Sequence, residues 1–388
     1  MTATAVSPVA TCNQIVILQL QYLSLHNFRN YTSARFEVCA GPVVLSGRNG
    51  AGKTNILEAI SLLTPGRGMR KSRLGEMDAQ GQDQPWVITA TVHGLQGEVK
   101  IGTGRDPENM EQSDKRLIRI DGKQAKSHAE LARHLAIIWL TPQMEQLFNQ
   151  GTSEGRKFLD RLVYSFDSEH ASRINEYEYA MRERNRLLAD GRADAIWLDA
   201  LEQTMAETGA AVAQARLSAI ESLNHAISLS KNSFPKAHIS TSGVVEEMLY
   251  NGLAAVDAED GFRKLLYQSR RQDAAAGRTL SGTHRSEMRV LHTEKQMPAE
   301  ACSTGEQKAM LLSMVLAQAR AAMLWKGVVP VLLLDEVAAH LDTIRRLELF
   351  EEICQIGAQV WMTGTDPKFF EELAGKAQFF EVENGQVF

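Results

Sequence analysis

The chain has few cysteines, no long apolar run and no excess of positive charge, and each of these absences excludes a class of protein. Its four cysteines are widely separated and form no C-x-x-C pair. A zinc site or a disulfide framework is therefore not expected, which fits a reducing cytoplasm. No apolar run is long enough to span a bilayer, so the chain itself is not expected to enter a membrane. Because the net charge is -5, nucleic-acid binding would need a local basic patch.

The rest of the composition is ordinary for a soluble globular protein, with 44% hydrophobic and 23% charged residues. A chain of 388 residues fits one large core or two to three domains. Residues 1–14 are rich in alanine, threonine and valine and lack a basic start. They predict a disordered tail rather than a signal peptide.

A glycine-rich loop with the sequence GRNGAGKT, at residues 47–54, organises the chain. It fits the phosphate-binding pattern G-x-x-x-x-G-K-[ST], with an apolar strand before it and helical spacing of apolar residues after it. A turn that only caps a helix would not need this full context. We predict that Lys53 reaches the β- and γ-phosphates of a nucleotide and that the Thr54 hydroxyl ligates Mg²⁺. The candidate nucleotide-binding residues of this loop are Gly47, Arg48, Asn49, Gly50, Ala51, Gly52, Lys53, Thr54 and Asn55.

A basic cluster at Arg67, Arg70, Lys71 and Arg73 begins one helix length beyond the loop. Most charge runs are solvated surface, and that interpretation stays open here. The position at the mouth of a nucleotide site makes a contact with phosphate or DNA an equal alternative.

Two later segments return to nucleotide chemistry. Residues 303–307, with the sequence STGEQ, open a helix with a capping box, and a capped helix N-terminus with a free serine can also receive a phosphate. Residues 331–336, VLLLDE, predict a buried strand that ends in two carboxylates at the edge where α/β sheets hold ligands. Asp335 is suited to hold Mg²⁺ through water, and Glu336 to polarise the attacking water as a general base.

Taken together, these residues resemble the ABC-type ATPases. In that family Asp335 and Glu336 would be the second nucleotide motif, Leu341-Asp342 would close the D-loop, and Gln143 is the candidate Q-loop residue and metal ligand. The signature motif that contacts nucleotide would be formed by Ser303, Thr304, Gly305, Glu306 and Gln307.

The resemblance narrows to the RecF family of DNA repair proteins, through LHNFRNY, GRNGAGKTNILEAISLLTPGR, RKFLDR and the SGTHR loop. It implies a two-lobed α/β ATPase head with a mixed sheet core, an inserted helical lobe and no long coiled coil. Lobe I would combine residues 15–148 and 301–388, with the signature helix at the junction, and residues 149–300 would form helical lobe II. The strand at 359–363 is expected to be the last core strand.

The resemblance also implies a function. ATP would close a head-to-tail homodimer on duplex DNA beside single-strand gaps, with the Ser303 loop of one chain completing the Lys53 site of the other. Hydrolysis would reopen it. RecR and RecO would be partners in loading RecA recombinase, in a cytoplasmic, nucleoid-associated setting. Arg67 and Arg70 match a family basic element and are candidates for sensing γ-phosphate or DNA.

Three positions depart from the family pattern. The signature reads STGEQ rather than LSGGQ, no histidine follows the strand at 359–363, and Gln143 stands where many family members carry an acid. Without the histidine, we expect a weak, DNA-stimulated ATPase with slow turnover.

Two other functions stay open. Helical spacing of apolar residues at 174–188 and at 198–227, with a break at 190–192, predicts a hairpin of two helices. The nucleotide-binding subunit of a membrane transporter would use a similar site, with Tyr22 or Phe28 stacking on adenine, but it would not need the FRNY block or this helical hairpin. An SMC-like chromosome-organising ATPase would carry much longer helical arms than this sequence predicts.

Overall fold

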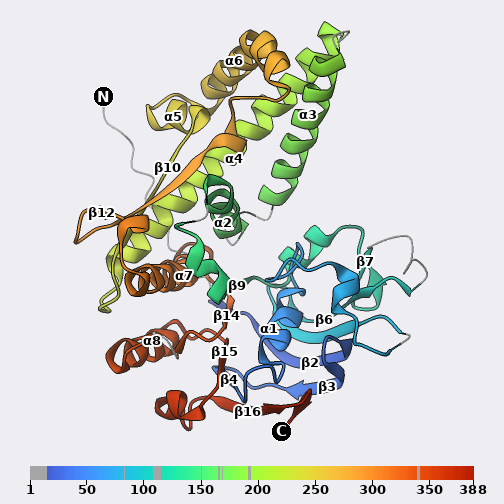
Figure 1. The fold of residues 1–388 in the computed structure, drawn as a ribbon, viewed down its shortest axis with the longest axis vertical. Helices are drawn as coiled ribbons and strands as arrows, with labels where there is room; N and C mark the ends of the chain where they lie inside the picture. Colours follow the sequence, from blue (N-terminus) through green and yellow to red (C-terminus); the bar gives the residue numbers. More distant parts are fainter. Residues whose placement is uncertain are drawn as a thin grey trace.

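The computed structural model describes residues 15–82, 84–107, 115–149, 151–164, 167, 169–190, 194–338 and 341–388. The predicted tail at 1–14 lies outside the described residues. Figure 1 shows two lobes: a sheet-containing lobe at the bottom and a mainly helical lobe at the top.

A six-stranded sheet forms the centre of the lower lobe, in the order β17-β16-β4-β15-β14-β9. Every pairing is parallel except β16 with β17. Parallel strands end at one shared edge, so the segments that follow β4, β14 and β9 lie side by side. The strands are β4 (Val43–Ser46), β9 (Ile137–Leu140), β14 (Val331–Leu334), β15 (Val360–Gly364), β16 (Gln378–Glu383) and β17 (Gln386–Val387).

Both faces of this sheet are covered, which explains why its inner strands read as continuous apolar runs. Val331 and Leu333 belong to one core cluster, whereas Leu332 and Leu334 belong to another. Helices α7 (Thr304–Lys326) and α8 (Thr343–Ile356) cover one face, and α1 (Lys53–Ser61) lies on the other, as Figure 1 shows.

A second, antiparallel sheet in the order β3-β2-β5-β6-β7-β8 packs over α1 (Figure 1). The alternating residues at 86–92 and the apolar spacing at 98–101 and 115–120, with a turn at 121–122, predict a β-meander. The structure confirms it, and both turn positions have positive φ. The strands are β2 (Gln19–Phe28), β3 (Tyr31–Glu37), β5 (Val87–Gly94), β6 (Gly97–Arg105), β7 (Arg116–Ile120) and β8 (Lys123–Gln124).

The upper lobe is built on a hairpin of two helices, α3 and α4. Asp194 accepts a hydrogen bond from the N–H of Ile196 and caps α4, and residues 191–193 before it lie outside the described residues. The helices are α2 (Thr152–Tyr164), α3 (His170–Asp190), α4 (Ala195–Leu229), α5 (Val244–Tyr250) and α6 (Ala255–Ala276). A small sheet joins them, with strands β10 (Ala237–Ser242), β11 (Glu287–His292) and β12 (Met297–Pro298).

Helix α7 connects the two lobes. It packs against α4 of the upper lobe and against β9 and β13 of the lower lobe. One core cluster joins Phe158 and Leu223 above to Leu311 and Leu332 below. The mixed sheet with an inserted helical lobe is therefore confirmed, whereas the boundaries at 148/149 and 300/301 stay predictions.

One strand prediction is wrong in detail. The strand at 359–363 is not the last core strand, because β16 follows it and pairs with β4. The predicted strand at 331–334 is confirmed as β14. Pro330, which has no N–H for a ladder, separates it from β13 (Val328–Val329), which pairs with β1 (Val16–Ile17).

Short 3-10 helices complete the described chain. They are η1 (Leu74–Met77), η3 (His128–Arg133), η4 (Pro142–Gln146), η5 (Thr283–Arg285), η6 (Ala299–Ala301) and η8 (Pro367–Leu373).

Candidate functional site

The glycine-rich loop turns the chain from β4 into α1, as the sequence predicts. Its backbone leaves no room for side chains at two positions. Gly47 has φ +146, and a Cβ there would lie 2.2 Å from the carbonyl oxygen of Val382. Gly52 has φ +116, and a Cβ there would lie 2.4 Å from the side chain of Asn30. The loop is thus held between the β2–β3 turn and β16.

Lys53 folds back over this loop. Its side chain is buried, and its ammonium donates to the carbonyl oxygens of Gly47 (2.6 Å) and Arg48 (2.9 Å). Burial lowers the pKa of Lys53, and the nearby carboxylates of Glu336 and Asp335 oppose this shift. The cation therefore points into the concave side of the loop, where a phosphate would supply better acceptors than carbonyls.

Thr54 and Asp335, 281 residues apart in the sequence, meet at the shared edge of the sheet. The Thr54 hydroxyl donates to Asp335 Oδ1 at 2.9 Å. Thr363, at the end of β15, donates to the same oxygen at 2.8 Å, and its hydroxyl accepts the backbone N–H of Glu336 at 2.8 Å. The two predicted nucleotide segments, Lys53-Thr54 and Asp335-Glu336, are thereby joined within one chain.

Asp335 is suited to a hard cation. Burial raises its pKa, while hydrogen bonds from Thr363 and Thr54 lower it. Within the described residues, no hydrogen bond reaches its second carboxylate oxygen. No group of three or more acidic, histidine or cysteine side chains gathers in the described part of the chain. A hydroxyl and one carboxylate are what Mg²⁺ commonly takes from a protein when phosphates and water supply the other ligands.

The FRNY block supports the loop from outside, a role that the sequence did not reveal. Asn30 donates to the carbonyl oxygen of Ala51 (2.9 Å) and accepts from Asn55 (2.8 Å). Arg29 has φ +57, so the turn is tight. The only sequence signal for this contact was a polar residue in a short turn between two strands.

Arg70 lies beside the loop helix, whereas Arg67 faces outward. One Arg70 nitrogen donates to Asn55 (2.7 Å) and to Glu58 (3.3 Å). Glu58 is fully buried and also pairs with Arg29 at 2.7 Å. Arg67 is exposed, and the described residues give it no hydrogen bond or ion pair. Of the two predicted basic sensors, the structure places Arg70 next to the site and leaves Arg67 at the surface.

Gln143 follows β9 on the neighbouring strand. Leu140 of β9 accepts the N–H of Asp335 at 2.9 Å, and Gln143 lies three residues further along, exposed, in η4. The structure therefore brings its segment to the edge of the sheet where Asp335 lies, but among the described residues its side chain makes no hydrogen bond to Asp335. Its role as a metal ligand stays a prediction.

The predicted signature segment caps α7. The Ser303 hydroxyl accepts the N–H of Glu306, and the Glu306 carboxylate accepts the backbone N–H of Ser303 at 3.1 Å, so the capping box is complete. The Ser303 hydroxyl also donates to this carboxylate at 2.8 Å. Lys295 pairs with the other oxygen of that carboxylate. Hydrogen bonds from Lys295 and Ser303 lower the pKa of Glu306 to about 2.

The remaining signature residues differ in exposure. Gln307 is buried, and its amide nitrogen donates to the backbone carbonyl of Ala299 at 2.9 Å. Thr304 and Gly305 are exposed, and a Cβ at Gly305 would meet nothing within 4 Å. Among the described residues, no hydrogen bond or ion pair joins 303–307 to the phosphate loop.

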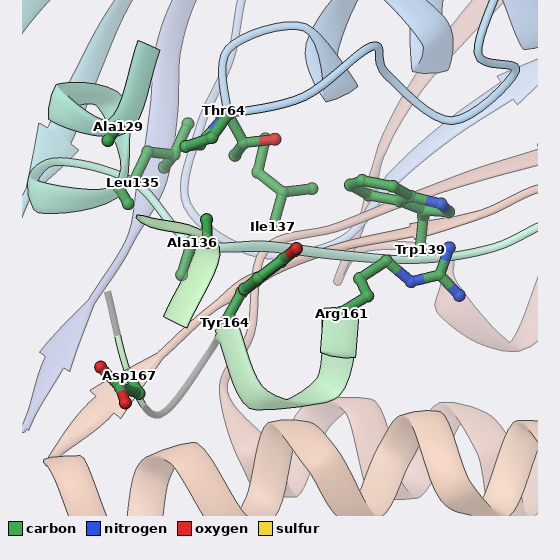
Figure 2. A pocket seen from close by; sticks show the side chains of 12 residues that line it. Thr64, Ala129, Leu135, Ala136, Ile137, Trp139, Arg161, Tyr164 and Asp167 are labelled. Atoms are coloured by element: carbon green, nitrogen blue, oxygen red, sulfur yellow. The ribbon is translucent and has the colours of Figure 1, made fainter. Parts of the chain in front are cut away.

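A mostly apolar pocket of about 70 Å³ lies away from this site, at the seam between the lobes (Figure 2). Thr64 and Trp139 come from the lower lobe, and Arg161 and Tyr164 come from α2. The Arg161 guanidinium carbon lies 5.1 Å from the ring centroids of Trp139 and Phe158, and burial lowers its pKa to about 10. None of the described residues that line the pocket belongs to the phosphate loop or to the Asp335-Glu336 segment. We therefore assign no nucleotide to it.

Comparisons with known proteins agree with this geometry. The family model for the RecF/RecN/SMC N terminal domain matches residues 19–387. The DNA replication and repair protein RecF of Allorhizobium ampelinum is 46% identical over 367 residues, which is 94% of this chain and 97% of the relative. RecF of Mesorhizobium japonicum is 47% identical over 94% of this chain and 96% of its own length.

Solved structures show the same fold. The recombination mediator protein RecF-ATPrS of the RecFOR pathway gives a TM-score of 0.83 at 24% identity, and covers 96% of this chain and 98% of its own. The Smc head domain of Pyrococcus furiosus gives a TM-score of 0.54 at 16% identity over 96% of this chain. With a family model over nearly the whole length and relatives close to half identical, this chain belongs to the RecF family of the RecF/RecN/SMC proteins.

Proposed function

We propose that this chain is an ATP-driven DNA clamp of recombinational repair and replication restart. ATP closes a homodimer on duplex DNA beside single-strand gaps, and slow, DNA-stimulated hydrolysis reopens it. The closed form helps RecO and RecR load RecA in the cytoplasm, at the nucleoid. The names of the relatives, DNA replication and repair proteins, support the pathway.

The observation that carries the proposal is the contact between Thr54 and Asp335. It places the start of the loop helix, an acid at the end of a buried strand and Glu336 beside it within one hydrogen-bonded group. In this reading Lys53 and the loop N–H groups bind the phosphates, and Glu336 accepts a proton from the attacking water. Gly47 to Asn55 form the phosphate cradle.

Mg²⁺ would be held by Thr54 and Asp335, with Gln143 as a further candidate, and when bound it supplies charge neutralisation at the phosphates. For this to occur, the Thr54 hydroxyl has to turn away from Asp335. The open second oxygen of Asp335 supports this ligand set.

The dimer is supported by the exposure of the signature segment. Ser303, Thr304 and Gly305 stand at the surface at the start of α7, where the helix N-terminus favours an anion. Their separation from Lys53 in the described contacts fits a phosphate that comes from a second copy. Glu306 and Gln307 would hold the segment in shape, and Arg70 would sense the γ-phosphate.

DNA binding is assigned to local basic residues because the whole chain is acidic. Arg67 and Arg285 are exposed, and among the described residues the side chain of neither makes a hydrogen bond or ion pair. Burial lowers the pKa of Arg156, and the nearby charges of Arg216 and Arg285 lower it further, so Arg285 belongs to a cluster of positive charge. Both positions are candidates for phosphate contacts along DNA.

The two alternatives receive less support. No helix among the described residues has the length and apolar composition of a bilayer span, but a transporter subunit would borrow its span from a partner, so flotation with membranes is the test for that reading. An SMC-like role would need long arms, whereas α4, the longest described helix, has 35 residues.

The experiment is the mass of the protein in solution, measured with and without ATP and duplex DNA, for the wild type and Ser303→Arg. We expect ATP to double the mass of the wild type only, and DNA to strengthen the shift. A chain that stays monomeric with both ligands would contradict the clamp, and a partner in a membrane or another protein would then be sought.

A further inference from the structure

The side chain of Thr363 contacts both acidic residues of the site, and neither nucleotide binding nor hydrolysis has assigned it a role. Thr363 is the last residue but one of β15. This strand lies between β4, which leads into the phosphate loop, and β14, which leads into the two acids. Thr363 is 1% exposed. Its hydroxyl donates to Asp335 Oδ1 (2.8 Å) and accepts the backbone N–H of Glu336 (2.8 Å), so one oxygen contacts both acidic residues.

Glu336 needs such a support. Its φ is +55, in the left-handed region that few residues other than glycine adopt. The hydrogen bond from its N–H to Thr363 holds this conformation, which determines where the Glu336 carboxylate points. Without the hydroxyl, the N–H would lose its acceptor and the conformation its local stabilisation.

We propose that Thr363 is the positioning residue for both acids: it holds Asp335 in place when Thr54 turns to the metal, and it fixes the backbone that carries Glu336. The inference rests on the proposed ATPase function. In the structure Asp335 Oδ1 accepts two hydroxyl protons, from Thr54 and Thr363. Once Thr54 faces Mg²⁺, only the Thr363 proton remains to orient that oxygen.

The same contacts explain why Thr363 cannot act as a phosphate sensor. Its single proton is donated to Asp335, and its oxygen accepts from Glu336, so no donor is left to face a nucleotide.

The test compares Thr363→Val, which keeps the shape and removes the hydroxyl, with Thr363→Ser, which keeps the hydroxyl. We expect the valine variant to hydrolyse ATP roughly tenfold more slowly or worse. The Mg²⁺ concentration for half-maximal activity should rise, whereas ATP affinity measured without Mg²⁺ should stay within about threefold of the wild type. The serine variant should recover most of the rate.

Thr365→Val is the matched control. Thr365 is exposed two residues further along, and its hydroxyl makes no hydrogen bond to another described residue. It should behave as the wild type. A melting curve shows whether Thr363→Val is folded. If it is not, binding of Mn²⁺ to the ATP-loaded serine variant, followed by electron paramagnetic resonance, should match the wild type.

Wild-type rate and metal dependence in the valine variant would overturn the inference, as would a serine variant as slow as valine, because the methyl group rather than the hydroxyl would then matter. A Mn²⁺ signal from the serine variant unlike that of the wild type would also overturn it. A wild-type protein that binds no ATP would instead contradict the proposed function, so the two failures are distinguishable.

Discussion

The two halves of the proposed nucleotide site are built in different ways. In the lower half Lys53, Asp335 and Thr363 are buried, and hydrogen bonds connect residues from three neighbouring strands. In the upper half Ser303 is exposed, and within the described residues its hydroxyl is hydrogen-bonded to Glu306, three residues away. The first half depends on contacts between residues far apart in the sequence, whereas the second depends on its own helix start and on Lys295 shortly before it.

Because of this difference, we expect nucleotide binding and closure of the dimer to depend on different halves of the site. The lower half is fully formed in one chain, so a single protomer should bind nucleotide. The upper half has a complete cap but no described contact with a phosphate-binding group, so its contribution requires another surface to approach. Substitutions in the lower half should therefore change binding and hydrolysis, whereas substitutions in the upper half should change association.

The largest expected effect is on hydrolysis in Glu336→Gln. A general base contributes at least about 100-fold to many reactions, and the amide cannot accept the proton. Because its shape and backbone conformation are kept, ATP should still bind and the closed dimer should accumulate. The measurements are the steady-state ATPase rate and the mass in ATP.

Glu371→Gln is the control for this change, since Glu371 is exposed in η8 and forms no ion pair with another described residue. Normal turnover in Glu336→Gln would remove Glu336 from its role.

Lys53→Ala should come next, with an effect on binding. The ammonium makes two short hydrogen bonds inside the loop, and a charge-assisted bond to phosphate is worth about 1.5–3 kcal/mol. ATP affinity should fall about 10- to 100-fold, and ATP-dependent dimerisation should be lost. Titration of a fluorescent ATP analogue measures the first, and solution mass measures the second.

Lys368→Ala, at an exposed lysine of η8, should leave both unchanged. An unaltered ATP-dependent dimer in Lys53→Ala would refute the site assignment and, with it, the contrast between the two halves.

The lower half could be predicted from the sequence where contiguous patterns carry it. In GRNGAGKT and VLLLDE the candidate phosphate-binding residues and the two carboxylates come directly after an apolar strand. Parallel strands bring such strand ends to one edge of a sheet. The fold class followed from the family resemblance that these and other motifs carry. The side chains that support the chemistry could not be predicted in this way, because they come from elsewhere in the chain.

Thr363 illustrates the limit. Its hydroxyl reaches Asp335 only because β15 lies between β14 and β4 in one register, with Thr363 opposite Leu45. A shift of one residue would turn the hydroxyl to the other face, and no local pattern encodes that register. Strand β16 was missed for a related reason: it is half exposed and carries Glu381 and Glu383, so its sequence lacks a buried run.

The smallest expected effect is on stability in Glu306→Gln, and it tests whether the upper half is held by its own helix. The folded-state pKa of Glu306 is lowered from 4.5 to about 2. A lowered carboxylate pKa contributes stability that is fully present above the unfolded value and is lost as the pH falls through the folded value. The wild type should therefore lose its advantage over Glu306→Gln between about pH 5 and about pH 2.

Because Glu306 and Lys295 are solvent-accessible, water and salt screen the pair. The difference in Tm should be small, at most about 2 °C, and should shrink at high salt. Glu351→Gln provides the baseline. Glu351 is an exposed acid of α8 that forms no ion pair with another described residue. A Tm difference that is as large at low pH as at neutral pH would show that Glu306 acts through packing rather than charge. The helix start that presents Ser303 would then depend on its neighbours, as the lower half does.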